Sequence, residues 1–333
     1  MRASGAPAPR RHAFHECAPP SATPSFASAA DAAGWVTHFR RSPLVGTRTA
    51  RLDPEDIVAT TGRVAYQGEP GAYSEEALLA LFPDGEALGY RTFRTTFEAL
   101  LRREADLAIV PVENTLGGIV QESNDLLWER PGLRLVQEYI HPIRHCLLGF
   151  ASSRVERALS HPQALAQVRR YLEAREIEPV PHHDTAGAAR QVAQQPEPGL
   201  AAVAGVAAAR RYGLEVLAEG IQDDDSNRTR FVVVECGRPA RPGEAPSGSK
   251  CSLCFAAAHV PGSLVAALQC LSTRGLNLTR LEARPIPDKP FEYRFFLDFV
   301  VGEPSIAEEG LRDLEATARE VRLFGTYGTF RGA

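Results

Sequence analysis

Three features are scarce in this sequence of 333 residues, and each scarcity excludes a class of protein. No uninterrupted apolar run approaches the roughly 20 residues that a transmembrane helix requires, so we expect no integral membrane protein. Lys and Arg total 37 against 41 Asp and Glu, so a formal net charge of −4 offers no basic surface for nucleic acid or a membrane. The 6 cysteines are too scattered for a disulfide framework, which favours a reducing compartment.

The usual sequence patterns for cofactors and metals are also missing. No GxGxxG follows a strand, and neither a Walker P-loop nor a GxSxG elbow occurs, so the sequence predicts no nucleotide cofactor and no classical hydrolase. Cys251 and Cys254 form a CxxC inside an expected strand, without a second Cys or His pair, so we interpret them as structural cysteines. We interpret the acidic run at 223–225 as a solvated turn. We expect His182 and His183 to be surface side chains that face opposite ways. We expect no cofactor and no metal.

Residues 1–62 differ from the rest in composition. Ala, Pro, Ser and Arg dominate, and Glu16 is the single acidic residue among the first 30, so we predict a disordered extension. An Arg-rich, Ser-rich, acid-poor start is typical of organellar transit peptides, and also of extensions in high-GC bacteria. We therefore expect a cytoplasmic protein, with the plastid stroma as the alternative.

Residues 63–237 alternate short apolar runs with amphipathic or Ala-rich stretches, which predicts a largely parallel α/β architecture. The expected strands cover residues 63–67, 107–112, 133–139, 146–151, 201–204 and 230–236. The expected helices cover residues 75–82, 96–103, 120–127, 162–174, 186–194 and 206–212. Ligands of such folds bind where the carboxyl ends of strands meet the amino ends of helices.

The chain after residue 237 indicates a second domain. Residues 238–249 are rich in Pro, Gly and Ser, so we interpret them as a linker to a domain at 250–333. Its expected elements are a strand at 251–258, a helix at 262–273, strands at 276–284 and 293–301, a helix at 306–321 and a short last strand at 323–327. The order βαββαβ predicts a ferredoxin-like fold. Because such a small sheet commonly pairs through its edge, we expect a homo-oligomer.

Four polar clusters share one design, in which an apolar strand ends, Gly or Pro turns the chain, and Ser, Thr or Asn starts a helix. They lie at 67–75, 111–118, 160–163 and 184–189. Helix amino ends present unpaired N–H groups and partial positive charge, so these clusters indicate an anionic small-molecule ligand.

Two polar pairs stand next to buried runs. Glu113 and Asn114 directly follow the apolar run 107–112, where a parallel strand delivers side chains to a binding crevice. Thr229 and Arg230 lie at the entry to another apolar run. There Arg230 can pair with a carboxylate, and Thr229 can hydrogen-bond a reacting oxygen.

Taken together and in this order, the clusters resemble the prephenate dehydratase family, with its close relatives the arogenate dehydratases. The resemblance runs from about residue 63 to the end and rests on GxPGAYSE at 68–75, PVENTLGG at 111–118, HCLLG at 145–149, SHPQALAQ at 160–167, DTAGAA at 184–189 and NRTRF at 227–231. It implies a catalytic region of two α/β lobes, similar to periplasmic binding proteins, with the active site in the cleft between the lobes. The late strand at 230–236 would return to the first lobe.

The resemblance implies an enzyme, a carbon–oxygen lyase of phenylalanine biosynthesis. Prephenate would lose its ring hydroxyl and ring carboxylate together, giving phenylpyruvate, water and carbon dioxide, and formation of the aromatic ring would drive the elimination without a cofactor. Arogenate, with an amino group in place of the keto group, is the alternative substrate, and an enzyme for both is a further alternative. A non-catalytic amino-acid sensor is the remaining one, and the presence of Thr229, Arg230 and Asn114 argues against it.

The resemblance also implies roles for single residues. Thr229 would hydrogen-bond the leaving hydroxyl, and because threonine is a poor acid this role is electrostatic and positional. Asn114 and Arg230 would complete the catalytic group and bind carboxylate. The expected substrate-binding residues are Ser160, Gln167, Glu113, Tyr73, Ser74 and Thr185.

Residues 250–333 resemble the ACT regulatory domain, in which phenylalanine binds at an interface between two copies. The expected effector-binding residues are Gly262, Ser263, Leu264, Asn277, Leu278, Glu282 and Arg284. The family usually has Ala where Ser263 stands and Ser where Ala283 stands, so the effector stays open. The resemblance implies a dimer or tetramer with a small-molecule substrate, phenylalanine as effector, and no nucleic-acid or membrane partner.

Overall fold

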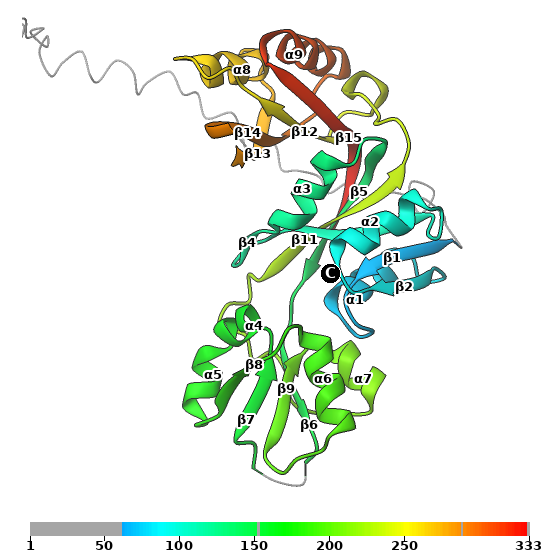
Figure 1. Ribbon diagram of the computed structural model, residues 1–333, viewed down its shortest axis with the longest axis vertical. Coiled ribbons are helices and arrows are strands. Elements are labelled where there is room, and N and C mark those ends of the chain that lie inside the picture. Colours follow the sequence, from blue (N-terminus) through cyan, green and yellow to red (C-terminus); the bar gives the residue numbers. More distant parts are fainter. Residues whose placement is uncertain (1–61, 152–153, 288, 332–333) are drawn as a thin grey trace, which may run out of the picture. The chain divides into compact units, whose positions relative to one another are not determined.

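The computed structural model describes residues 62–151, 154–287 and 289–331, drawn as coloured ribbon in Figure 1. The extension expected at 1–62 lies outside the described residues except for its last position. Within the described part, no helix is long and apolar enough to cross a membrane. The elements form a first α/β lobe, a second α/β lobe inserted into it, and a C-terminal domain.

The first lobe is built on a mixed sheet. Its strands are β1 (Arg63–Gln67), β2 (Glu86–Tyr90), β3 (Leu107–Asn114), β4 (Gly118–Ile119), β5 (Leu133–Pro142) and β11 (Arg228–Cys236), and its helices are α1 (Tyr73–Leu81), α2 (Phe93–Leu101) and α3 (Gln121–Glu129). The strand order is β5-β11-β3-β1-β2. Strand β1 is parallel to β2 and β3, whereas β11 is antiparallel to β3 and β5. The expected return of the late strand is confirmed, but a largely parallel sheet is wrong because β11 re-enters from the second lobe.

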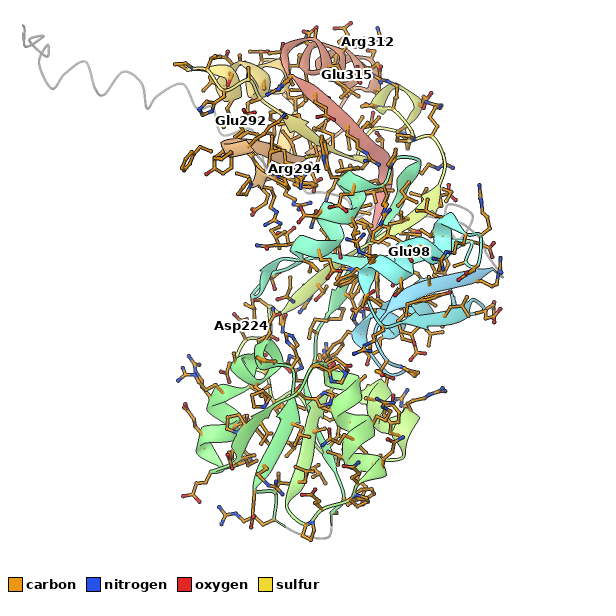
Figure 2. The ribbon with its side chains drawn as sticks, in the orientation of Figure 1. Glu98, Asp224, Glu292, Arg294, Arg312 and Glu315 are labelled. Atoms are coloured by element: carbon orange, nitrogen blue, oxygen red, sulfur yellow. The ribbon has the colours of Figure 1, made fainter. Side chains whose placement is uncertain are left out.

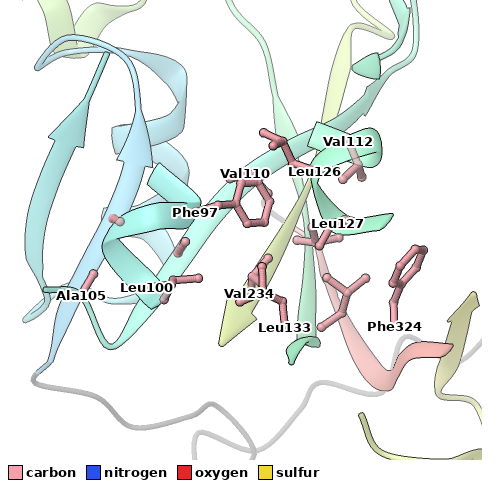
Figure 3. Packing of buried hydrophobic residues seen from close by; sticks show 14 of the residues in the cluster. Phe97, Leu100, Ala105, Val110, Val112, Leu126, Leu127, Leu133, Val234 and Phe324 are labelled. Carbon is pink, nitrogen blue, oxygen red and sulfur yellow. The ribbon is translucent and has the colours of Figure 1, made fainter. Parts of the chain in front are cut away.

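Side chains of the central strands alternate between two hydrophobic layers. On β3, Leu107 and Ile109 pack with α1, whereas Ala108 and Val110 pack with α2 and α3. Figure 3 shows the second of these layers, with Val110 beside Phe97 and near the leucines of α3. Successive side chains of a strand point to opposite faces, so an unbroken apolar run belongs to a strand covered on both sides.

The second lobe has its own sheet. Its strands are β6 (Cys146–Gly149), β7 (Arg157–Ser160), β8 (Glu178–Pro181), β9 (Leu200–Ala204) and β10 (Glu215–Ala218), and its helices are α4 (Pro162–Gln167), α5 (Arg169–Ala174), α6 (Thr185–Gln194) and α7 (Val206–Tyr212). The strand order is β10-β6-β9-β7-β8. Helices α4 and α5 pack with one layer and α6 and α7 with the other, so this sheet is also covered on both faces (Figure 1).

The single helix expected at 162–174 is two helices. Val168, with φ of −121°, separates α4 from α5. Asp223 explains the break, because its backbone N–H donates to the Gln167 carbonyl at 2.7 Å and its carboxylate accepts from the Arg170 N–H at 3.2 Å. The acidic run is therefore more than a solvated turn, since one of its members satisfies backbone groups at a helix junction.

The C-terminal domain has the βαββαβ order expected from the sequence. Its elements are β12 (Lys250–Ala256), α8 (Ser263–Ser272), β13 (Asn277–Ile286), β14 (Lys289–Val300), α9 (Pro304–Thr317) and β15 (Glu320–Arg331). The strand order β13-β14-β12-β15 is that of a ferredoxin-like sheet. The preceding segment is held in place, because Arg241 beside the short helix η3 (Pro242–Glu244) pairs with Glu308 and Glu315 on α9.

The two cysteines of the CxxC lie in different hydrophobic layers. Cys251 packs in the core of the C-terminal domain, whereas Cys254 packs in the core shared with the first lobe. Burial raises the pKa of the Cys251 thiol to about 12 and also raises the pKa of Cys254. Two thiols that point to opposite faces of one strand have the surroundings of structural cysteines.

Strand β15 is much longer than the segment expected at 323–327. Its last part, from Gly328 to Arg331, runs parallel to β5, so the sheets of the first lobe and the C-terminal domain are continuous. Phe324 of β15 lies in the same hydrophobic cluster as Leu127 and Leu133 (Figure 3). Gly325, with φ of +148°, permits the crossing, because a Cβ there would lie 2.5 Å from the Leu135 carbonyl oxygen.

Candidate active site

The expected site residues gather where the chain crosses between the two lobes. Asn114 ends β3, and Thr229 faces it across the antiparallel pairing of β3 with β11. Gln167 ends α4 of the second lobe, and Tyr73 begins α1 of the first. His145 lies between β5 and β6, on the first of the two crossings.

Asn114 fixes the orientation of Thr229. Its Oδ1 accepts hydrogen bonds from the backbone N–H groups of Leu116 at 3.0 Å and Gly117 at 2.7 Å. A backbone N–H only donates, so the carboxamide cannot be reversed, and Nδ2 must face Thr229, where it donates to Oγ1 at 3.0 Å. Within the described chain this is the sole hydrogen bond of the Thr229 hydroxyl, so its own proton is free for a ligand.

A second set of hydrogen bonds connects Asn114 to residues of the second lobe. The two hydrogens of Asn114 Nδ2 are shared among Thr229 Oγ1, the Arg228 carbonyl at 3.0 Å and Asn227 Oδ1 at 2.8 Å. Asn227 Nδ2 donates to Gln167 Oε1 at 3.0 Å. The same Gln167 oxygen lies 2.8 Å from His145 Nε2, and His145 Nδ1 lies 2.8 Å from the Tyr73 hydroxyl. We call these six residues, Tyr73, His145, Gln167, Asn227, Asn114 and Thr229, the inter-lobe polar chain.

The lobes also meet at Glu76 of α1. Its Oε2 lies 3.4 Å from His141 Nε2, and its Oε1 accepts from the Ala207 N–H at 3.3 Å at the start of α7. Gly205 allows this approach, since a Cβ there would lie 2.4 Å from Glu76 Oε1. This contact joins the lobes beside the inter-lobe polar chain, because Gly205 also lies against the ring of Tyr73.

The structure corrects the prediction for Arg230. Its side chain, 9% exposed, does not share the face of Thr229, because neighbouring residues of a strand point to opposite sides. Its guanidinium pairs with Glu138, lies 2.6 Å from Asp298 Oδ2, and donates to the Tyr327 hydroxyl at 3.1 Å. The Arg230 guanidinium, expected to bind substrate, is therefore paired with two buried carboxylates.

These charges form a buried cluster. Lys250 Nζ lies 2.7 Å from both oxygens of Glu138, and Ser252 Oγ donates to Asp298 Oδ1 at 2.5 Å. Burial opposes ionisation of Asp298, but the attraction of Arg230, Arg280 and Lys250 together with the Ser252 hydrogen bond outweighs it and holds the pKa of that carboxyl below its usual range. We call Arg230, Glu138, Lys250, Asp298, Ser252 and Tyr327 the domain-junction charge cluster. It joins β11 and β5 of the first lobe to the C-terminal domain.

The remaining expected substrate-binding residues are dispersed. Ser160 is fully buried and its Oγ donates to the Val203 carbonyl at 2.6 Å, so it ties β7 to β9 instead of facing a ligand. Thr185 is half-buried in the first turn of α6, and Ser74 is buried in the first turn of α1. Glu113 is 40% exposed, with Oε2 3.6 Å from Arg230 Nη1. The structure thus corrects the role of Ser160 and leaves Glu113 accessible.

One group among the described residues has the geometry to hold a metal ion: Glu69, His183 and Asp184. Glu69 pairs with Arg190 at 3.3 Å, and the other two members lie beside each other, with His183 Nε2 3.0 Å from Asp184 Oδ2. The rings of His182 and His183 are 4.1 Å apart, so the expectation that they face opposite ways is wrong. The backbone after β8 turns there and is no longer extended.

The expected effector residues fall into two groups. Ser263 and Leu264, which follow Gly262 at the start of α8, line a cavity of about 360 Å³ together with Val260 and Tyr293. The expected residues of β13 do not line this cavity. They are Asn277, Leu278, Glu282 and Arg284.

Arg284 has a partner in the catalytic region. Its Nη2 lies 2.5 Å from Asp125 Oδ2 on α3, and Arg294, labelled in Figure 2, lies 3.1 Å from the other oxygen of the same carboxylate. This ion pair joins the C-terminal domain to α3, and the role of Arg284 in effector binding stays a prediction.

The same face of β13 contacts the strand that carries Asn114. Arg280 Nη2 donates to Asn124 Oδ1 at 2.8 Å, and Asn124 Nδ2 donates to the Val112 carbonyl at 3.1 Å. Val112 lies two positions before Asn114 on β3. A short polar route therefore connects the C-terminal domain to the end of that strand.

Sequence reasoning missed four polar residues of the lobe junction: Glu76, His141, His145 and Asn227. Two of them stand inside the sequence patterns HCLLG and NRTRF, so the patterns marked the right segments. Their contacts depend on residues more than twenty positions away, such as the 22 positions between His145 and Gln167.

Fold and site together define a two-lobed α/β enzyme with a hydrogen-bonding centre at the lobe junction and a ferredoxin-like domain behind it. Comparison with known proteins agrees. The family model for prephenate dehydratase matches residues 64–238. An Arabidopsis thaliana protein described as arogenate dehydratase/prephenate dehydratase 2, chloroplastic, is 40% identical over 304 residues, covering 87% of this chain and 79% of that one. Arogenate dehydratase 2 of Petunia hybrida is 40% identical over 299 residues, covering 83% and 74%.

Two solved structures share the fold. The prephenate dehydratase of Arthrobacter aurescens in complex with L-Phe has a TM-score of 0.73 at 27% identity, covering 80% of this chain and 89% of that one. A protein described as GqqA, a novel type of quorum quenching acylase, has a TM-score of 0.73 at 34% identity, covering 80% and 98%. The chain belongs to the prephenate dehydratase family, whose members are carbon–oxygen lyases.

Proposed function

We propose that this enzyme removes water and carbon dioxide together from prephenate, with arogenate as the alternative substrate. The observation that carries the proposal is the inter-lobe polar chain, which leaves the Thr229 hydroxyl proton and the Gln167 Nε2 group without protein partners in the described chain. Two directed donors at one junction suit a substrate with a leaving hydroxyl and a carboxylate.

The reaction needs little general acid–base catalysis. The bond between the ring and its carboxylate breaks, its electron pair moves into the ring, and the ring hydroxyl leaves as hydroxide that takes a proton to become water. Thr229 donates a hydrogen bond to the departing oxygen and stabilises its developing charge. Asn114 orients Thr229, and Gln167 donates its amide hydrogens to a carboxylate. The gain of an aromatic ring supplies the driving force, so these residues position and polarise the substrate.

The test is turnover of both substrates by the full chain. Prephenate and arogenate are supplied separately at equal concentration, and the initial rates of phenylpyruvate and phenylalanine formation are compared. Faster prephenate turnover supports our assignment, and faster arogenate turnover supports the alternative that the plant relatives' names suggest. Failure to convert either substrate would overturn the proposal and leave the amino-acid sensor.

The acylase among the structural relatives raises a second activity, which the geometry does not favour. Acyl transfer needs a nucleophile with a base in hydrogen-bond reach. Thr229 is bonded to the Nδ2 group of Asn114, which cannot accept its proton, and Ser160 donates to a backbone carbonyl. Among the described residues, neither hydroxyl therefore has a hydrogen bond to an activating base.

We also propose phenylalanine as the effector, bound at the cavity beside α8 in a dimer or tetramer. The relative from Arthrobacter aurescens is described in complex with L-Phe. Val260 and Val265 at this end of the domain are 61% and 58% exposed, so a second copy would cover apolar surface there. Residues of β13 from that copy, Asn277 and Leu278 among them, would complete the site. Inhibition by phenylalanine, measured with the mass of the assembly, tests both statements.

The plastid alternative for the location has support from the relatives, since the Arabidopsis thaliana protein at 40% identity is described as chloroplastic. Fusing residues 1–62 to a fluorescent protein and adding it to isolated chloroplasts tests this. Import with cleavage supports the plastid, and exclusion supports the cytoplasm.

A further inference from the structure

In the inter-lobe polar chain, the donor and the acceptor of each hydrogen bond between carboxamides can be assigned. The backbone N–H groups of Leu116 and Gly117 require an oxygen at Asn114 Oδ1, so Asn114 presents donors to Asn227 Oδ1. Asn227 then presents its own donors to Gln167, whose contacting atom must be the oxygen. The two backbone donors in the first lobe thereby decide which atom of Gln167 faces its neighbours in the second.

The same assignment of donors and acceptors determines which ring nitrogen of His145 carries the hydrogen. Gln167 Oε1 can only accept, so His145 Nε2, at 2.8 Å, must carry a hydrogen. A neutral ring protonated at Nε2 leaves Nδ1 as an acceptor for the Tyr73 hydroxyl at 2.8 Å, and the single proton of that hydroxyl is shared with the Arg144 carbonyl at 3.0 Å. His145 is 2% exposed, and burial lowers its pKa, which agrees with a neutral imidazole.

The backbone of His145 is also hydrogen-bonded to the other segment that crosses between the lobes. Its backbone N–H donates to Gln222 Oε1 at 3.0 Å, and its carbonyl accepts from the Ile221 N–H at 3.1 Å. His145 lies on one crossing between the lobes, and Gln222 and Ile221 lie before the other. The backbone of His145 is therefore hydrogen-bonded to the segment of the second crossing, while its Nε2–H donates to the Gln167 oxygen.

We propose that His145 is a positioning residue of this enzyme: as the neutral Nε2–H tautomer it holds the Gln167 carboxamide with its NH₂ group toward the substrate carboxylate. The inference rests on the proposed dehydratase function. Without the histidine donor, the Gln167 side chain keeps the bond from Asn227 but loses one of the two partners that prevent its rotation.

Three variants separate the two ring nitrogens. Gln at 145 places an amide near the former Nε2, Asn places one near the former Nδ1, and Phe keeps a ring with neither. We expect kcat/KM of H145Q to stay within about threefold of the parent, and H145N and H145F to lose about tenfold or more. Y73F, which removes the hydroxyl at Nδ1, is the matched control and should lose less than H145F. Equal losses for H145Q and H145F would contradict the proposal, and thermal unfolding shows whether each variant folds.

A double-mutant cycle tests the partner. If His145 acts through Gln167, H145F/Q167A will match Q167A within about twofold, because the carboxamide that His145 positions is already gone. Independent losses that multiply would overturn the proposal.

The tautomer is tested without turnover. Nitrogen NMR of the full chain labelled at histidine, with the His145 signals assigned by their loss in H145F, should show a protonated Nε2 and an unprotonated Nδ1 near neutral pH. A protonated Nδ1 would refute the assignment even in an active enzyme. If the parent converts neither substrate while NMR shows the Nε2–H tautomer, the proposed function fails and the structural part of the inference stands.

Discussion

Replacing Arg230 by Met should lower stability much more than a typical surface change does. Arg230 and Lys250 supply two positive charges against Glu138 and Asp298, and all four side chains are at most 17% exposed. In R230M, Glu138 retains its ion pair with Lys250, whereas Asp298 loses its ion-pair partner and retains the Ser252 hydrogen bond and the weaker attraction of Arg280 and Lys250. Breaking one partner of such a buried group costs about 3–5 kcal/mol. The continued pairing of Glu138 favours the lower figure, about 3 kcal/mol.

The assay is thermal unfolding of the full chain, with kcat/KM measured on the same preparations. For a chain of this size, about 3 kcal/mol lowers Tm by roughly 6–12 °C. Arg134, which pairs with Glu235 and is 35% exposed, supplies a matched control in the same sheet. R134M should cost no more than about 1 kcal/mol, because the pair is partly solvated.

The outcome that would refute this reasoning is specific. If Arg230 instead held a substrate carboxylate, R230M would unfold at the same temperature as R134M while its KM rose steeply. We also expect R230M/D298N to unfold at a higher temperature than R230M, because the second change removes the uncompensated charge. A double variant less stable than R230M would count against the cluster as described.

Three further predictions concern the hydroxyl donor, the pH dependence and the contact between domains. T229V removes the hydrogen bond to the leaving oxygen, so it should lower kcat by at least about a hundredfold with little change in Tm. T229S keeps the hydroxyl and should retain most of the parent kcat. Equal rates for T229V and the parent would contradict this role. The pKa of Asp298 is lower in the folded chain, so its stabilisation is present above its unfolded pKa and is lost as pH falls below about 4; D298N should therefore show a weaker loss of stability on acidification than the parent. R280Q removes the contact with Asn124 and should raise the phenylalanine concentration needed for half-inhibition without changing the uninhibited rate; an unchanged inhibition curve would exclude this route.

Much of the fold could be read locally. Unbroken apolar runs such as 107–112 predicted strands buried on both faces, and these strands do supply two hydrophobic layers. Pro162 and Asp184 mark helix starts that the structure confirms. Strands with weak apolar patterns, such as β2 and β10, were not predicted, because half-exposed edge strands carry little periodic signal.

The candidate site was only partly predictable. Sequence patterns identified the segments that hold Asn114, Gln167, Tyr73 and Thr229, and the structure joins all four through hydrogen bonds. The sequence could not show that Arg230 faces away from them, because its partners Glu138 and Asp298 are 92 and 68 positions distant and belong to other elements. Pairing over such separations depends on strand register, which no local pattern contains.

By itself, then, the sequence determined what short-range physics decides: the alternation of buried and exposed side chains, the helix starts, and the polar residues that follow each strand. The tertiary structure alone decided which polar groups meet. The continuation of β15 along β5 brings Asp298 and Tyr327 to Arg230, and the two lobe crossings bring His145 to Gln167. A buried ionic or hydrogen-bonding side chain is assigned its role by whichever partner folding places within about 3 Å of it, and that partner is chosen by the packing of whole elements.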